Sequence, residues 1–162
     1  MAVQLSDAEI TRLLAERKAL PTNFRQLLQP KPKRGHSEHE MSIKGGAGSR
    51  FRLLIRQSLL NPLDFSVILG YLPEEVTGLF RLRRYNGKSH EHTNKIEGGR
   101  FYEFHIHTAT ERYQERGMDE DGFAEPTGRF SDLSGAIDCM VADCGFDLPA
   151  EPQMGLRFTR ES

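Results

Sequence analysis

Apolar and polar residues alternate along the middle of the chain. The stretch 50–56 alternates large apolar residues mostly with arginines, and the same period of two runs through 63–71, 80–83 and 102–107. Alternation of this kind is typical of antiparallel strands that have one covered face. The pattern therefore predicts a sheet of four antiparallel strands.

Helical spacing of apolar residues precedes and follows these strands. Ser6 opens a capping-box pattern, so a helix is expected to begin there and to end before Pro21, with a second short helix over 23–29. From 131 to 144 the helical period returns, with Ser131 as its expected cap. The order predicts an α+β domain: an N-terminal helix, a four-stranded antiparallel sheet and a C-terminal helix packed on one face of the sheet.

The spacing of prolines and glycines divides the chain into four segments. Residues 1–29 are expected to form a helical segment, and the Pro- and Gly-rich residues 30–49 a flexible linker or loop. The α+β domain then spans 50–147, and 148–162 form a C-terminal tail.

The composition is that of one folded domain. Of 162 residues, 37% are hydrophobic and 28% are charged, which suits a chain with a core of its own. Its apolar runs are far shorter than the roughly 20 residues that cross a membrane, and its N-terminus lacks a signal-peptide pattern. We therefore expect a cytoplasmic protein without a membrane partner.

Charge is unevenly distributed along the chain. Residues 1–116 carry 19 Lys and Arg against 13 Asp and Glu, a net charge of +6, whereas 117–162 carry 3 against 10, a net charge of −7. A basic body suggests an anionic partner. The alternative is that the two parts neutralise each other within the fold.

The run Phe104-His105-Ile106-His107 is the most distinctive chemistry in the sequence. Because side chains alternate along a strand, Glu103, His105 and His107 are expected on one face, with Tyr102, Phe104 and Ile106 pointing into the core.

The neighbouring strands add arginines that could share this face. A sheet surface rich in arginine and histidine could bind the phosphate backbone of a nucleic acid, RNA in particular, although a solvated face gives the same pattern. The predicted nucleic-acid contacts are Arg50, Arg52, Arg56, Arg81, Arg83, Tyr85 and Arg112.

Two histidines beside arginines could also catalyse RNA cleavage without a metal. His105 and His107 would act as acid and base on a 2′-hydroxyl, with Glu103 and Tyr113 as further candidate catalytic residues. This mechanism requires no cofactor, and none is predicted.

A zinc site is the competing interpretation of the histidines. His90 and His92 form a second His-X-His pair, which could converge with the first pair on one ion. The spacing is not diagnostic, so no metal site is predicted and His90 and His92 remain weak candidates. The run resembles the metal-binding strand of PHP-type phosphoesterases, but those enzymes need further histidines downstream and none follows His107.

Four stretches between about residues 79 and 146 resemble an uncharacterised family of small bacterial proteins: RLRRYNGKSHEHTN, FHIHTATERYQERG, FAEPTGRFSDL and DCGF. The resemblance covers under half of the chain. Because no activity is assigned to that family, the resemblance implies only a bacterial or phage-borne cytosolic protein.

The leading hypothesis is thus a small nucleic-acid-directed protein; if it is an enzyme, a metal-independent endoribonuclease of a toxin–antitoxin or phage-defence module is expected. The alternative is a non-catalytic protein-binding module or inhibitor that uses the charge division to dock on a partner protein.

Overall fold

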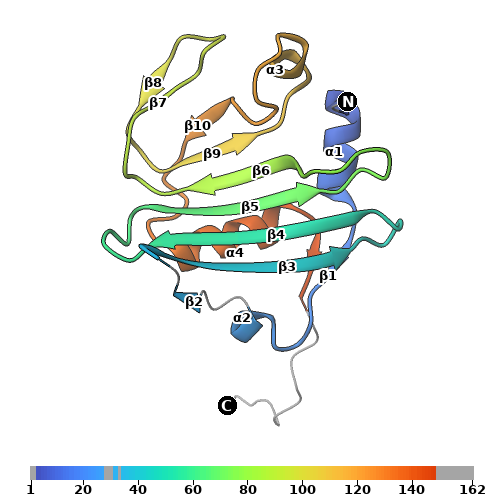
Figure 1. Cartoon of the computed structure of the whole chain (residues 1–162), viewed down its shortest axis with the longest axis horizontal. Helices are drawn as coiled ribbons and strands as arrows, with labels where there is room; N and C mark the ends of the chain where they lie inside the picture. Colours follow the sequence, from blue (N-terminus) through green and yellow to red (C-terminus); the bar gives the residue numbers. More distant parts are fainter. Residues whose placement is uncertain (1–2, 28–30, 33, 149–162) are drawn as a thin grey trace.

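A computed structural model describes residues 3–27, 31–32 and 34–148 as an α+β fold built on one large antiparallel sheet (Figure 1). Its seven strands follow the order β10-β9-β6-β5-β4-β3-β2. In that order they are β10 (Ala124–Pro126), β9 (His105–Thr108), β6 (Phe80–Asn86), β5 (Phe65–Tyr71), β4 (Arg50–Ser58), β3 (His36–Lys44) and β2 (Lys31–Pro32).

Two short ribbons and four helices complete the described fold. Strand β1 (Lys18–Ala19) pairs in parallel with β11 (Phe146–Asp147), and β7 (His92–Thr93) pairs with β8 (Arg100–Phe101) as an antiparallel hairpin. The helices are α1 (Asp7–Ala15), α2 (Phe24–Leu27), α3 (Glu111–Glu115) and α4 (Leu133–Asp143).

The predicted strands are present, but the sheet is larger than predicted. Strands β4, β5, β6 and β9 correspond to the four alternating stretches, and β2, β3 and β10 extend the sheet at its two edges. The prediction of a linker over 30–49 is wrong, because β3 pairs with β4 along its whole length. Most residues of β3 are polar, so the alternation of its two faces does not appear in the hydrophobic pattern of the sequence. The predicted tail from 149 onward lies outside the described residues.

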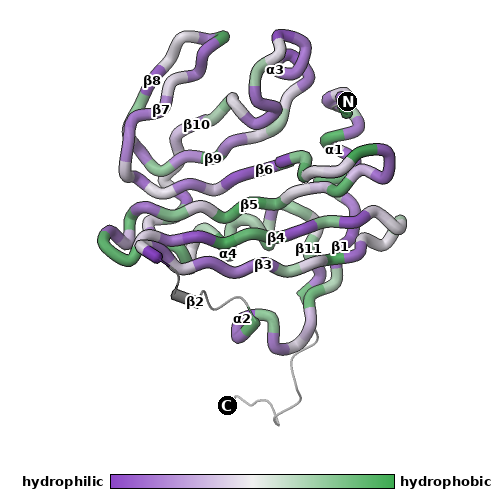
Figure 2. The backbone as a smooth tube through the Cα atoms, in the orientation of Figure 1, coloured by the Kyte–Doolittle hydropathy of each residue, from purple (hydrophilic) through white to green (hydrophobic). Residues whose placement is uncertain are grey.

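The core lies between the sheet and α4, which runs behind β4 and β5 in Figure 1. The alternating residues Phe51, Leu53 and Ile55 of β4 are buried, as are Ala136 and Met140 of α4. Figure 2 shows apolar residues concentrated on the central strands and hydrophilic residues along β3 and β6. We call the opposite side of the sheet the open face.

Helix α1 begins as predicted. The Ser6 hydroxyl accepts a hydrogen bond from the Glu9 amide, and the Glu9 carboxylate accepts one from the Ser6 amide, so the capping box is confirmed. The cap of α4 is Asp132 rather than the predicted Ser131, because its carboxylate accepts from the Gly135 amide at 2.8 Å.

Lys18 joins the two ends of the fold. Its buried ammonium donates to the main-chain carbonyls of Leu13, Leu14, Glu16 and Cys144 at 2.8 to 3.2 Å. These carbonyls lie at the C-terminal ends of α1 and α4, where the last turn of a helix leaves carbonyls without hydrogen-bond partners inside the helix. Burial lowers the pKa of Lys18 to about 8, so the charged form still predominates at neutral pH.

Much of the charge division is resolved inside the molecule. The acidic turn after α3 pairs with Arg81 and Arg84 of β6, and Asp143 of α4 pairs with Arg83 and Arg129. Neutralisation within the fold therefore accounts for a large part of the charge asymmetry. No described helix is long and apolar enough to cross a membrane.

Candidate metal site

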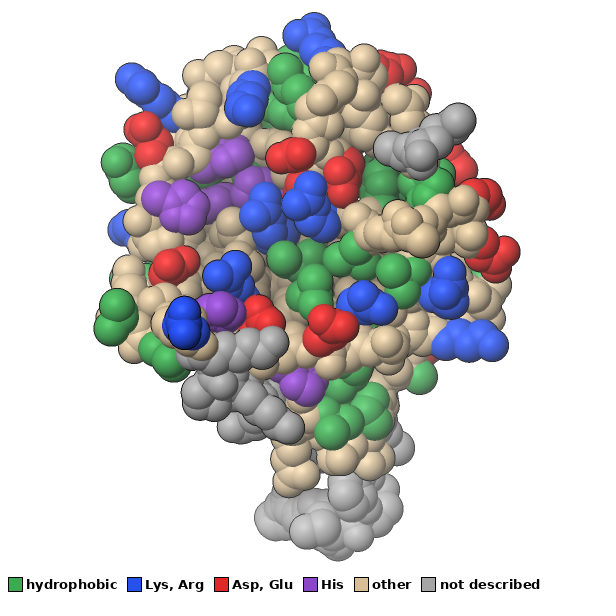
Figure 3. All heavy atoms as spheres, in the orientation of Figure 1, with side chains coloured by type: hydrophobic (Ala, Val, Ile, Leu, Met, Phe, Trp, Pro, Cys, Tyr) green, Lys and Arg blue, Asp and Glu red, His purple; other side chains and the backbone are tan. Residues whose placement is uncertain are grey.

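Three histidines from two separate elements meet at the β9 end of the open face. His105 and His107 come from β9, and His92 comes from the β7–β8 hairpin. One ring nitrogen of each lies within 4.8 Å of the others. Figure 3 shows histidine side chains gathered in the upper left of this face. We call these three residues the histidine cluster.

Main-chain carbonyls fix the ring orientation of the two β9 histidines. The Nδ1 of His105 lies 2.8 Å from the Glu103 carbonyl oxygen, and the Nδ1 of His107 lies 2.7 Å from the Asp121 carbonyl oxygen. A carbonyl oxygen can only accept, so each Nδ1 carries the proton. The Nε2 atoms are then left with their lone pairs, which is the form that binds metals.

Asn94 orients the third histidine in the same way. Its amide donates to the Ala124 carbonyl and its oxygen accepts from the Ala124 amide, at 2.8 and 2.9 Å. That pairing fixes the Asn94 oxygen as the atom 2.9 Å from His92 Nε2, so Nε2 donates and Nδ1 keeps the lone pair. All three rings therefore present one nitrogen lone pair each.

The hairpin that carries His92 is held at its far end by α3. Glu97 lies in the turn between β7 and β8. Its carboxylate accepts a hydrogen bond from the Tyr113 hydroxyl at 2.7 Å and forms an ion pair with Arg112 at 2.6 Å. Phe101 of β8 contacts the rings of His92 and His105. Tyr113 and Arg112, predicted as catalytic and nucleic-acid-binding, thus anchor the hairpin.

The hairpin also buries the β9 histidines. His105 and His107 are only 2% and 3% exposed, so the alternative of a solvated sheet face does not hold at this strand. Burial, as the main cause, lowers the pKa of His105 to about 4 and that of His107 to about 2. The neighbouring Arg84 guanidinium lowers both further, because it disfavours a second positive charge. Both rings are therefore neutral at physiological pH.

A buried ion pair lies next to the cluster. Asp121, whose carbonyl orients His107, has a fully buried side chain 3.1 Å from Arg84 and 3.5 Å from Arg81. Burial raises the pKa of Asp121, while the two guanidiniums oppose the shift. The acidic turn at 119–121 thus contributes one buried carboxylate, Asp121, to the pairing with β6.

A β-bulge in β6 changes which arginines reach the open face. Leu69 of β5 pairs with Arg83, but the next residue, Gly70, pairs with Arg81. Leu82 is therefore an extra residue in β6, and the alternation shifts by one position there.

The shift overturns the prediction that Arg83 and Tyr85 share the histidine face. Both point toward α4, where Tyr85 donates to Asp143 at 2.8 Å and Arg83 lies 3.5 Å from the same carboxylate. Arg84 and Asn86 occupy the open face instead, directly opposite the two β9 histidines in the sheet register. Sequence alternation missed both, because a single extra residue has no signature in the hydrophobic pattern.

The other predicted residues are spread over the open face. Arg50, Arg52 and Arg56 lie along β4 opposite its buried positions, and Arg52 pairs with Glu40 at 3.6 Å. Glu103 is exposed just before β9, and it contributes its main-chain carbonyl to the cluster rather than its carboxylate.

Tyr102 and His90 do not lie where the sequence predicted. Tyr102, expected in the core, is 58% exposed, because β9 begins only at His105. Phe104 and Ile106 do pack against the core, as expected. His90, the other weak metal candidate, is exposed and outside the cluster.

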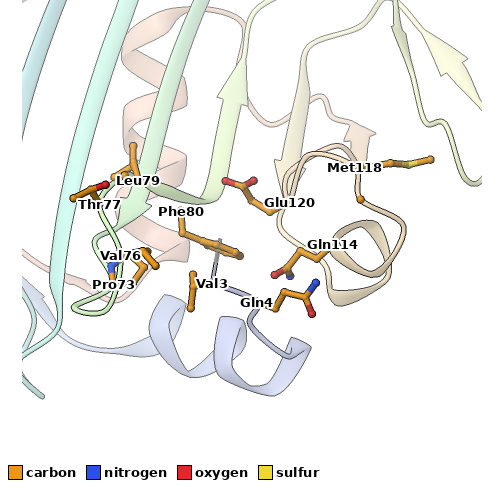
Figure 4. Close-up of a pocket in the computed structure, with 12 residues that line it drawn as sticks. Val3, Gln4, Pro73, Val76, Thr77, Leu79, Phe80, Gln114, Met118 and Glu120 are labelled. Carbon is orange, nitrogen blue, oxygen red and sulfur yellow. The ribbon is translucent and has the colours of Figure 1, made fainter. Parts of the chain in front are cut away.

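A separate cavity of about 350 Å³ lies between the N-terminal segment, the β5–β6 loop and α3 (Figure 4). Val3, Phe80 and Met118 contribute to its largely apolar wall. Two of its polar side chains are already engaged: Gln114 bonds the main chain of the N-terminal segment, and Glu120 pairs with an arginine of β6. This cavity therefore offers less chemistry than the histidine cluster.

No protein-family model matches the chain, and searches of curated proteins and of solved structures give no match. The resemblance to small bacterial proteins accordingly stays a prediction. The argument for a functional site depends on its geometry.

Proposed function

We propose that this protein binds one divalent transition-metal ion, zinc in the first instance, through His92, His105 and His107, as a metal-dependent hydrolase. The observation that carries the proposal is the convergence of three imidazoles, each with one ring nitrogen held by a hydrogen bond. Metal-binding histidines typically have such a partner.

The distances are compatible with an ion after a small closure. Zinc–nitrogen bonds of about 2.0–2.1 Å place tetrahedral ligand nitrogens about 3.3 Å apart, against the limit of 4.8 Å here. His105 and His107 lie on one strand, so the closure falls mainly on the hairpin that carries His92.

Three protein ligands suit a catalytic rather than a structural zinc ion. The described residues place no fourth histidine, cysteine or carboxylate in the same group. Catalytic zinc sites keep the remaining position for a water molecule, which the ion makes acidic enough to form hydroxide near neutral pH. The site is therefore suited to hydrolysis.

The metal-independent ribonuclease mechanism has less support. It needs one protonated and one neutral histidine, whereas burial keeps His105 and His107 both neutral. The two rings are better suited to donate lone pairs to an ion than to transfer protons.

Elemental analysis tests the proposal directly. Protein dialysed against buffered zinc and then freed of excess metal is expected to retain about one ion per chain, and EDTA should remove it reversibly. Because ligands stabilise the folded state that binds them, the melting temperature should fall on EDTA treatment and recover with zinc. Absence of any stoichiometric metal, with zinc, cobalt, nickel, copper and iron each tried, would sink the proposal.

Asn94 provides a test of positioning. Asn94→Ala removes the acceptor that orients His92, and metal affinity is expected to fall roughly 10- to 100-fold, the usual effect of losing a partner of a metal ligand. Asn94→Asp keeps the acceptor for His92 but loses the donor to the Ala124 carbonyl, so it should recover only part of the affinity. Competition with a chromophoric chelator measures both variants, with circular dichroism to show that they fold. Equal affinity in Asn94→Ala and the wild type would show that His92 needs no such support.

A further inference from the structure

A second polar site lies beside the histidine cluster on the open face. It is a groove of about 500 Å³ at the ends of β3, β4 and β5, with an exposed loop residue, His90, on its wall. Figure 3 shows a second group of histidine and Lys or Arg side chains in the lower left of the same face. We call it the basic groove, with Arg34, His36, Arg56, Ser58, Ser66 and His90 among its lining residues.

The groove carries unpaired positive charge. Within the described part of the chain, Arg34 and Arg56 form no ion pair, whereas Arg52, Arg81 and Arg84 of the same face all do. The acidic residue of the lining is Asp64. Two free guanidiniums with serine hydroxyls nearby are suited to a phosphate group, which guanidinium binds through paired hydrogen bonds.

The sheet register fixes the spacing between groove and cluster. Ser66 in the groove lies opposite Asn86, and Asn86 lies opposite His105. Adjacent strands are about 4.8 Å apart, so the groove and the cluster are separated by about 10 Å along this row. A ligand on the open face could thus occupy both sites.

Asn86 links the two sites and has unused hydrogen-bonding capacity. The residue is 6% exposed, and its side-chain oxygen has no hydrogen-bond partner among the described residues. A buried acceptor without a partner costs free energy, so such groups usually mark a place where a ligand or water donates. In the sheet register Asn86 lies between Ser66 of the basic groove and His105 of the histidine cluster.

We propose that the basic groove binds a phosphate group of a nucleic-acid strand whose reacting phosphodiester lies at the histidine cluster. This inference rests on the proposed function and names its substrate class. A single phosphate cannot span about 10 Å, whereas a strand repeats its phosphates about every 3.4 Å of helical rise and can fill both sites.

The reaction that follows is hydrolysis of the phosphodiester. A water molecule gives up a proton, its oxygen forms a bond to phosphorus, and the ester P–O bond breaks. The departing oxygen takes up a proton, so the products are a phosphate monoester and an alcohol.

Binding to metal-free protein tests the groove separately from the ion. The probe is a short fluorescein-labelled single-stranded RNA, with adenosine monophosphate as a second ligand, titrated against EDTA-treated protein. The double variant Arg34→Ala/Arg56→Ala is expected to bind the RNA roughly tenfold or more weakly, with its salt slope reduced by about 1.4, the value for two phosphate contacts on a single strand. Arg12→Ala is the control, because it removes an exposed arginine of α1 that lines neither the groove nor the histidine cluster.

The outcomes separate the two proposals. If the RNA binds and only the double variant weakens it, the groove is supported whether or not the protein holds metal. If adenosine monophosphate binds and the RNA does not, the phosphate site stands but the nucleic-acid strand is overturned. If neither ligand binds, or if Arg12→Ala weakens binding equally, the groove proposal is overturned while elemental analysis still decides the metal site.

Discussion

Replacing His107 with alanine is expected to lower the zinc affinity of this protein roughly a thousandfold. Structural zinc sites release about 10–16 kcal/mol in total, and on that scale one ligand of three or four contributes about 4 kcal/mol, equivalent to a factor of about 1,000. His107 is buried and closely supported, since the Asp121 carbonyl orients it and Arg84 lies opposite in the sheet. Chelator competition and elemental analysis both measure the loss.

His90→Ala is the control for this experiment. His90 lies two residues before His92 in the sequence but is exposed and outside the cluster. Its removal should leave zinc stoichiometry unchanged and affinity within about twofold. If His90→Ala and His107→Ala bind zinc equally well, the histidine cluster is not the metal site.

Lys18→Met is expected to cause the largest loss of folding stability, about 3–4 kcal/mol. Methionine fills a similar volume but cannot donate, so four carbonyls would lose their shared partner, and buried polar groups without partners cost about 1–3 kcal/mol each. Relief of the buried charge offsets part of that cost. Because the free energy of unfolding of such domains is about 5–15 kcal/mol, the variant should lose a large part of its stability.

Urea denaturation measures this change, and the melting temperature should fall by about 10 °C. Lys88→Met is the matched control, because Lys88 is exposed and the same substitution there should change stability by less than about 0.5 kcal/mol. A loss below about 1 kcal/mol in Lys18→Met would mean that water replaces the ammonium at these carbonyls.

The fold was predictable where side chains alternate over a buried face. Strands β4, β5, β6 and β9 follow from that pattern, and so does the opposition of His105 and His107 to Phe104 and Ile106. Strand β3 was not predictable, because it lies next to the edge of the sheet and buries few side chains, so that its sequence is that of a polar loop.

The site was predictable only in part. The shared face of His105 and His107 follows from the strand period, but their burial does not. It depends on the β7–β8 hairpin, whose strands are too short to give a pattern. The contribution of Asn94 is also invisible in the sequence, because it depends on the main chain of Ala124, thirty residues away.

The open face of β6 is more sensitive to chain length than to side-chain identity. Loss of the extra residue, Leu82, would keep the strand pairs on both sides of it, but loss of a paired residue after the bulge, such as Arg84, would send the later side chains of the strand to the opposite face. Tyr85 would then take the place of Arg84 opposite His107, and its hydrogen bond to Asp143 of α4 would be lost. For this strand, a one-codon deletion is therefore expected to be more harmful than most single substitutions.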